Sequence, residues 1–247
     1  QGWTGILIPE QYGGSDFGLA GIGVVLEELG RTLTPSPLFA TSVVCATLIN
    51  KAGNNDQKEE YLKKIASGEI TMSFALEEGP RHKPFSIDLE AKKDGDNFIL
   101  NGKKNFVIDG GFSDYIIVAA RTSDNEDQIS LFILDKNYDG LNILPTVMVD
   151  HKNAANIEFD NLEISEENLL GSENNAKEII EKGITTIEEL KKHEELLNNV
   201  QKKGLKYYDD LTHRIPREEI EIYDEKIQKV FDTIFASQKL QCKRTLR

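Results

Sequence analysis

Cysteine, tryptophan and long apolar runs are all scarce in this 247-residue sequence. Its two cysteines, Cys45 and Cys242, lie far apart and show no metal-ligand spacing with histidine, so we expect unpaired thiols in a reducing compartment and no metal site. No apolar run approaches the roughly 20 residues that cross a bilayer, and no N-terminal signal pattern is present, so we expect no membrane partner. A cytoplasmic protein is therefore expected. The alternative is the mitochondrial matrix, which would need a targeting segment that these residues do not include.

Acidic residues exceed basic ones by 13, and the excess is confined to the first part of the sequence. Residues 173–247 hold 15 basic and 15 acidic side chains, which leaves 14 basic and 27 acidic ones in residues 1–172. An acidic surface repels phosphates, so nucleic-acid binding by residues 1–172 is not expected. Composition also changes at this point, from turn-rich and β-branched to Lys/Glu-rich and helical, which predicts a domain boundary.

Residues 1–68 carry helical patterns. Apolar side chains in Ala20–Arg31 recur at the spacing of one helix face, and the more uniformly apolar Leu38–Lys51 predicts a buried helix with Gly53 as its C-cap. An amphipathic pattern over Asp56–Ser67 predicts a third helix. Gly21-Ile-Gly23 lacks the GxGxxG spacing of a dinucleotide fingerprint, so it does not indicate a nucleotide site.

Residues 69–172 carry the pattern of an antiparallel β domain. Asp94-Gly95 and Asn101-Gly102 suit two-residue hairpins, because both central residues can take positive φ angles. Short apolar runs predict strands at Leu89–Lys93, Asn97–Leu100, Lys103–Ile108, Tyr115–Ala120, Ser130–Leu134 and Ile157–Phe159.

Four motifs follow one another in order: Gly2-Trp3…Ile8-Pro9-Glu10-Gln11-Tyr12-Gly13-Gly14, Phe74-Ala75-Leu76-Glu77-Glu78, Gly102-Lys103-Lys104-Asn105-Phe106-Val107-Ile108-Asp109-Gly110 and Val118-Ala119-Ala120-Arg121. In this order they resemble the acyl-CoA dehydrogenase family over residues 1–172. The resemblance implies an α+β fold, with a partial N-terminal helical domain (1–68) and a middle β domain (69–172). That middle domain is expected to be an antiparallel barrel or sandwich that faces flavin and acyl-CoA.

The resemblance also implies a cofactor, FAD. The residues implied in holding its isoalloxazine ring are Phe74, Ala75, Leu76, Phe106, Val107 and Ile108. Phe106 keeps the family's aromatic that packs on the ring, whereas Ile108 replaces a hydroxyl residue. Arg81 and Ser86 lie in the loop that in the family contacts the acyl-CoA. The alternative, that Phe74 and Phe106 are ordinary core aromatics, stays open.

The same resemblance implies no catalytic residue here. In the family, a carboxylate from a C-terminal helical domain removes the α-proton of the acyl-CoA while hydride passes to the flavin. After Leu169-Leu170-Gly171 no motif of that domain is recognisable. We therefore assign no base, and expect a missing helical domain or a partner subunit to supply it.

A second resemblance begins after this point. Gly183-Ile184, Thr186-Ile187-Glu188-Glu189-Leu190, Gly204-Leu205-Lys206-Tyr207-Tyr208 and Arg214-Ile215-Pro216-Arg217-Glu218-Glu219 resemble a helical segment of family X DNA polymerases (DNA polymerase beta-like), next to a helix-hairpin-helix. The resemblance covers residues 176–231. It predicts a helical segment over 173–235 and a tail over 236–247. Residues that could touch phosphate are Lys202, Lys203, Lys206 and Arg217. The balanced charge favours a solvated face instead.

Three hypotheses follow. The first is a fragment of an acyl-CoA dehydrogenase-like oxidoreductase, FAD-dependent and acting on an acyl-CoA, that is inactive alone. The second is a DNA-binding module, and the third is a chimeric chain, joined near Gly171–Lys177, without autonomous activity. We favour the first for ancestry and the third for activity.

Overall fold

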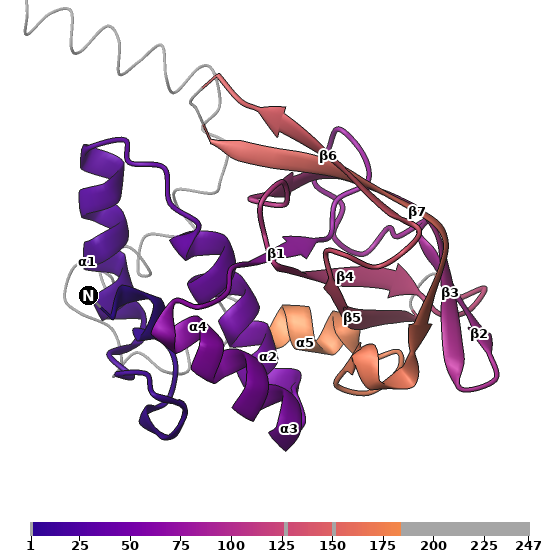
Figure 1. The fold of residues 1–247 in the computed structure, drawn as a ribbon, viewed down its shortest axis with the longest axis horizontal. Helices are drawn as coiled ribbons and strands as arrows, with labels where there is room; N and C mark the ends of the chain where they lie inside the picture. Colours follow the sequence, from indigo (N-terminus) through magenta and orange to yellow (C-terminus); the bar gives the residue numbers. More distant parts are fainter. Residues whose placement is uncertain (1, 126–127, 150–151, 184–247) are drawn as a thin grey trace, which may run out of the picture. The chain divides into compact units, whose positions relative to one another are not determined.

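Most helices of the protein precede its sheet and one, at residues 176–183, follows it (Figure 1). The computed structural model describes residues 2–125, 128–149 and 152–183. The predictions for residues 184–235 and for the tail 236–247 lie outside the described residues. The helices are α1 (Gly18–Arg31), a π-helical stretch (Phe39–Cys45) continuing into α2 (Ala46–Ala52), α3 (Asn55–Gln57), a second π-helical stretch (Lys58–Leu62) continuing into α4 (Lys63–Ser67), and α5 (Ala176–Gly183). The three predicted N-terminal helices are confirmed. No helix in these ranges is long and apolar enough to span a membrane.

Local chemistry explains where the third helical stretch starts and stops. The Asn54 side chain accepts a hydrogen bond from the Gln57 N–H, and the Gln57 side chain accepts one from the Asn54 N–H, which forms a capping box. Gly68 ends the helix in the left-handed conformation, at φ 76°. Gly53, by contrast, caps α2 in an extended conformation and donates its N–H to Ile49 O.

The strands form one eight-stranded sheet, in the order β6-β7-β3-β2-β4-β5-β8, with β1 paired to β4. Their bounds are β1 (Met72–Ala75), β2 (Glu90–Asp94), β3 (Asn97–Ile108), β4 (Tyr115–Arg121), β5 (Ile129–Asp135), β6 (Leu141–Val147), β7 (Asn153–Ser165) and β8 (Leu169–Leu170). The barrel-or-sandwich prediction is not borne out, because among the described residues the sheet is open. The antiparallel prediction holds for most pairs, but β1 and β2 both pair with β4 in parallel.

One predicted hairpin is confirmed and the other is wrong. β2 and β3 are joined by a tight turn at Gly95, whose φ is 62°. Asn101-Gly102, however, lies inside the continuous strand β3, where the pairing with β7 shifts register. Gly102 has φ 141°, and a Cβ there would stand 3.1 Å from Leu89 Cα. This glycine serves a bulge and a close backbone approach instead of a turn.

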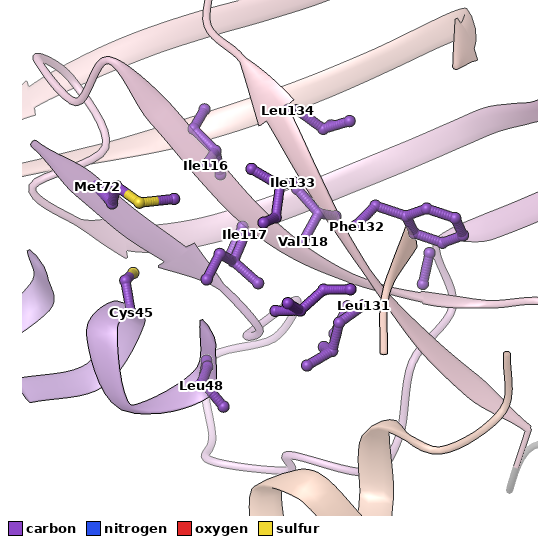
Figure 2. Packing of buried hydrophobic residues seen from close by; sticks show 14 of the residues in the cluster. Cys45, Leu48, Met72, Ile116, Ile117, Val118, Leu131, Phe132, Ile133 and Leu134 are labelled. Carbon is purple, nitrogen blue, oxygen red and sulfur yellow. The ribbon is translucent and has the colours of Figure 1, made fainter. Parts of the chain in front are cut away.

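The helices of residues 39–67, α5 and the sheet share one apolar core, whereas Ile22 of α1 packs in a second cluster with Ile6 and Leu38. Figure 2 shows Cys45 of the helical layer beside Met72 of β1, with residues of β4 and β5 continuing the same core. Thr41 fixes this contact, because its hydroxyl donates to Met72 O (3.0 Å) and accepts from Met72 N (2.9 Å). The predicted boundary between residues 68 and 69 divides the N-terminal helices from the strands, but these two parts are packed together.

Among the described strands, β6 lies at one edge of the sheet and pairs with β7. Pro145 lies in the middle of β6, opposite Ala155. Proline has no N–H to donate, so it is tolerated in edge strands and not in central ones. No strand was predicted from the sequence at β6.

Candidate functional site

Two segments that the sequence singled out meet in the structure. Residues 76–78 follow β1, and they contact the middle of β3 through its polar side chains and backbone. Asn105 N donates to Glu77 O at 2.7 Å, and the Asn105 side-chain amide donates to Glu78 O. Lys104 Nζ donates to Leu76 O at 3.1 Å. The two segments implied in flavin binding therefore form one continuous structure.

The second segment bulges outward. The β3–β7 pairing shifts between Lys104 and Val107, and Phe106 in this bulge has φ 54°. Positive φ is costly for a bulky residue, and Phe106 is also 53% exposed. Asn156 of β7 holds the bulge from the other side, because its side-chain oxygen accepts the Phe106 N–H at 3.1 Å. The chain thus holds an aromatic ring toward solvent in a strained conformation.

Two further exposed apolar residues lie on the same part of the sheet as Phe106. Leu144 of β6 pairs with Asn156, so Phe106 and Leu144 flank the same residue of β7. Ile108 lies two residues beyond Phe106 and is also exposed. We call Phe106, Ile108 and Leu144 the β3–β6 apolar surface. Gathered on neighbouring strands, they are candidates for contact with a ligand or another protein.

A tight turn follows this surface. Asp109 has φ 60°, and its backbone oxygen accepts the Ser113 hydroxyl at 2.7 Å, while Asn153 accepts the Asp109 N–H and the Gly111 N–H. The Asp109 residue is 6% exposed. Burial raises the pKa of its carboxyl group to about 6, and the nearby Lys152 partly opposes this. The turn therefore carries an acid that titrates close to neutral pH.

A buried ion pair lies beneath the junction. Lys104 Nζ is 2.6 Å from Glu78 Oε1, and the Lys104 side chain is fully buried. The Glu78 carboxylate also accepts from Asp88 N (2.6 Å) and Leu89 N (3.0 Å). Burial lowers the pKa of Lys104 to about 8, against the opposing attraction of Glu78. The sequence analysis missed this pair. The alternation of inward Phe98 and Leu100 along β3 places Lys104 inward too, and this signal could have found it.

The predicted cofactor residues fall into three groups by burial. Ala75 and Val107 are buried in the core, so they could serve a ligand only through their backbone. Phe74 and Leu76 are partly buried and pack on that core. Phe106 and Ile108 are exposed. The flavin assignment of all six stays a prediction.

The loop predicted to meet substrate is exposed. Arg81 and Ser86 both lie at its surface. The loop is tied to the junction because the Glu77 carboxylate contacts the His82 ring and accepts the Lys83 N–H at 3.3 Å. The loop therefore starts beside the bulge that carries Phe106. The residues proposed for phosphate contact, Lys202, Lys203, Lys206 and Arg217, lie outside the described residues.

Within residues 2–183 as described, no group of three or more His, Cys, Asp or Glu side chains is placed to hold a metal ion. Cys45 is a free, fully buried thiol, and burial raises its pKa far above the usual range. The second cysteine, Cys242, lies outside the described part.

Comparison with known protein families agrees with this geometry. Residues 1–69 match the acyl-CoA dehydrogenase N-terminal domain, and residues 77–162 match the acyl-CoA dehydrogenase middle domain. Residues 1–162 belong to the acyl-CoA dehydrogenase family. Residues 173–212 match the fingers domain of DNA polymerase lambda, which is a weak partial match that falls mostly outside the described residues.

Individual acyl-CoA dehydrogenases are similar along the same residues. Mitochondrial isovaleryl-CoA dehydrogenase of Pongo abelii is 32% identical over 193 residues, covering 74% of this chain and 46% of that protein. An acyl-CoA dehydrogenase of Bacillus subtilis (strain 168) is 32% identical over 180 residues, covering 70% and 48%. The structure of butyryl-CoA dehydrogenase from Megasphaera elsdenii matches with a TM-score of 0.66 and 27% identity, covering 74% and 51%. The chain thus spans about half the length of these relatives.

Proposed function

We propose that residues 1–172 form the flavin-holding part of a FAD-dependent oxidoreductase that acts on an acyl-CoA. The observation that carries this proposal is Phe106, an exposed aromatic ring held at φ 54° in a bulge that is anchored on both sides. Strained and exposed apolar residues cluster at ligand sites, where the ligand compensates for their cost. The acyl-CoA dehydrogenase family supplies the ligand class, because its chemistry uses FAD.

The residues present fit a flat, largely apolar ring. Phe106, Ile108 and Leu144 offer apolar contact area, and the exposed aromatic ring of Phe106 favours offset stacking. Ile108 offers no hydroxyl group, so in this chain polar contacts to the ring would come from backbone groups. The buried side chains of Ala75 and Val107 fix the backbone on either side of the junction.

Bound FAD would accept the hydride released when an acyl-CoA is dehydrogenated between its α and β carbons. In the proposed arrangement, Phe106 orients the ring and the β3–β6 apolar surface excludes water from one side of it. Arg81 and Ser86, in the loop anchored by Glu77, are the proposed contacts of the acyl-CoA. We assign no catalytic base among the described residues, and propose that a helical domain or a partner subunit contributes it.

The decisive experiment is FAD retention. The purified chain is mixed with FAD and desalted, and the flavin absorption and its dissociation constant are measured for Phe106→Ala and for Phe17→Ala, which removes an exposed phenylalanine from the start of α1. Loss of a stacked aromatic is expected to weaken FAD binding by roughly tenfold to a hundredfold. Phe17→Ala should leave it unchanged. Equal affinity in the wild type and Phe106→Ala would remove Phe106 from the proposed site.

Turnover is tested separately. We expect acyl-CoA titration of the flavin-loaded chain to leave the flavin oxidised, because no base is assigned in this chain. Bleaching of the flavin on addition of an acyl-CoA would overturn this expectation and would show that the chain contains its own base.

We propose a cytoplasmic location, with the mitochondrial matrix as the alternative, and cell fractionation would distinguish them.

The match of residues 173–212 to a polymerase fingers domain suggests nucleic-acid binding as a second candidate function, which the balanced charge of residues 173–247 argues against. Electrostatic binding to DNA weakens steeply as salt rises, by a slope that reflects the number of phosphate contacts. A gel shift with gapped duplex DNA at about 50 and 200 mM salt tests it. With 15 basic and 15 acidic side chains in residues 173–247, we expect no shift at either concentration.

A further inference from the structure

The buried Lys104–Glu78 pair joins three parts of the fold at one point. Lys104 comes from β3, Glu78 follows β1, and Glu78 binds the backbone N–H groups of Asp88 and Leu89 just before β2. We propose that this pair is a positioning device for the cofactor site, which sets the geometry of the Phe106 bulge. This inference rests on the proposed function.

The connection from the pair to Phe106 is short. Lys104 is followed in the chain by Asn105, which bonds both Glu77 O and Glu78 O, and then by Phe106. The ammonium group also holds Leu76 O at 3.1 Å. The side chains of Lys104 and Asn105 thus fix the backbone of residues 76–78 against the part of β3 that leads into Phe106. Moving either of these two side chains shifts the support on which Phe106 is held.

A purely structural role explains the pair less well. A buried ion pair contributes little net stability compared with apolar side chains of similar volume, because both charges lose their hydration. Lys104 nevertheless stands in a strand whose other inward side chains, Phe98 and Leu100, are apolar. The pair makes directional hydrogen bonds, which apolar side chains cannot make. Lys104 donates to the Leu76 carbonyl group and to the Glu78 carboxylate, and that carboxylate accepts two backbone N–H groups.

Charged groups around Lys104 make this device sensitive to pH. Besides Glu78, the carboxylates that act on it are those of Glu77 and Asp88, and Glu77 in turn contacts His82. Burial lowers the pKa of Lys104 to about 8, so the ammonium group loses its proton just above neutral pH. The neutral amine no longer attracts Glu78 as a charge. FAD affinity should therefore fall as the pH rises through about 8.

The test compares three variants of the full chain: Lys104→Gln, the double variant Glu78→Gln with Lys104→Gln, and Lys103→Gln. The double variant leaves no unpaired buried charge, so it protects the test against simple unfolding. Lys103 is the exposed neighbour on β3 and serves as the matched control. We expect the first two to weaken FAD binding at least tenfold and to remove its fall above about pH 8. Lys103→Gln should keep both the affinity and the pH dependence of the wild type.

A fourth variant, Leu62→Ala, controls for global destabilisation, because it opens the core in the 55–67 helix and removes no contact of the bulge. If Leu62→Ala weakens FAD binding as much as Lys104→Gln, or if the pH dependence survives in Lys104→Gln, the positioning role is wrong.

A protein-only measurement keeps the inference testable if the wild type retains no flavin. Amide hydrogen exchange at Asp88, Leu89 and Asn105 reports the junction itself, because these N–H groups bond Glu78 and Glu77. Lys104→Gln should speed their exchange at least tenfold while Lys103→Gln leaves it unchanged. Faster exchange without flavin binding would end the proposed function and keep the device. Unchanged exchange would overturn the device.

Discussion

Phe106 and Asp109 both have positive φ angles, which are unfavourable for these residues, and burial also makes the ionised carboxyl group of Asp109 unfavourable. Its pKa is raised from 3.8 to about 6, so between these values the folded state holds a proton that the unfolded chain has released. The stability that protonated Asp109 contributes is therefore complete below about pH 4 and is lost as the pH rises through 6.

Asp109→Asn is expected to raise the melting temperature above pH 6 by about 2–4 °C and to change it little near pH 4. Asparagine tolerates the positive φ of this position, so the turn is preserved. Asp109→Ala is the comparison, because alanine disfavours this φ and should lower the melting temperature at both pH values. A gain for Asp109→Asn that is the same at pH 4 and pH 7 would show that the carboxyl charge is not the cause. Thermal unfolding followed by circular dichroism decides this.

At the scale of the elements, β3 depends on a glycine in the middle of a strand. Gly102→Ala forces a side chain into a positive φ and against the backbone of Leu89, so we expect it to lower the free energy of unfolding by about 1–3 kcal/mol. Gly23→Ala is the matched control. Gly23 lies within α1 with open space around its Cα, so alanine there should raise stability by about 0.4–1 kcal/mol. Urea unfolding measures both, and equal effects would contradict the bulge explanation.

The elements that the sequence predicted well carry a strong local signal. Helices α1 and 55–67 have an apolar face, β4 and β5 are short and almost wholly apolar runs, and β2 ends at the Asp94-Gly95 turn, so all five appear close to their predicted bounds. Asn101-Gly102 misled the prediction, since the same dipeptide suits a hairpin turn and a bulge. The parallel pairing of β1 with β4 depends on contacts between distant residues, which local periods do not encode.

The site was predictable only in outline. The motifs placed Phe106 and Leu76 in segments that the structure brings together. They did not distinguish the exposed Phe106 and Ile108 from the buried Val107, because the irregular bulge interrupts the strand alternation there. The burial of Lys104 was not predicted because a lysine is expected at the surface, and only its inward position in β3 indicates that it is buried.

At the scale of the described molecule, the helices of residues 39–67 and the sheet should unfold together because they share one core. Thr41→Val removes both hydrogen bonds to the Met72 backbone and should lower stability by about 1–3 kcal/mol. Hydrogen exchange should report the same loss in the 55–67 helix and in β4–β5. Thr32→Val, at the exposed end of α1, should change neither. A loss confined to the helical amides would show two independently unfolding parts.

The proline in β6 has a consequence for how copies of this chain behave at high concentration. An edge strand with free N–H groups is a template on which a strand of another copy can add, and chains then stack into aggregates. Pro145 removes one donor from the middle of β6. In Pro145→Val, the strand beside the exposed Leu144 would gain a donor and a stronger β-forming residue. Pro145 thus opposes the addition of a second strand, and so fibre growth, at the edge of the sheet that carries the exposed Leu144.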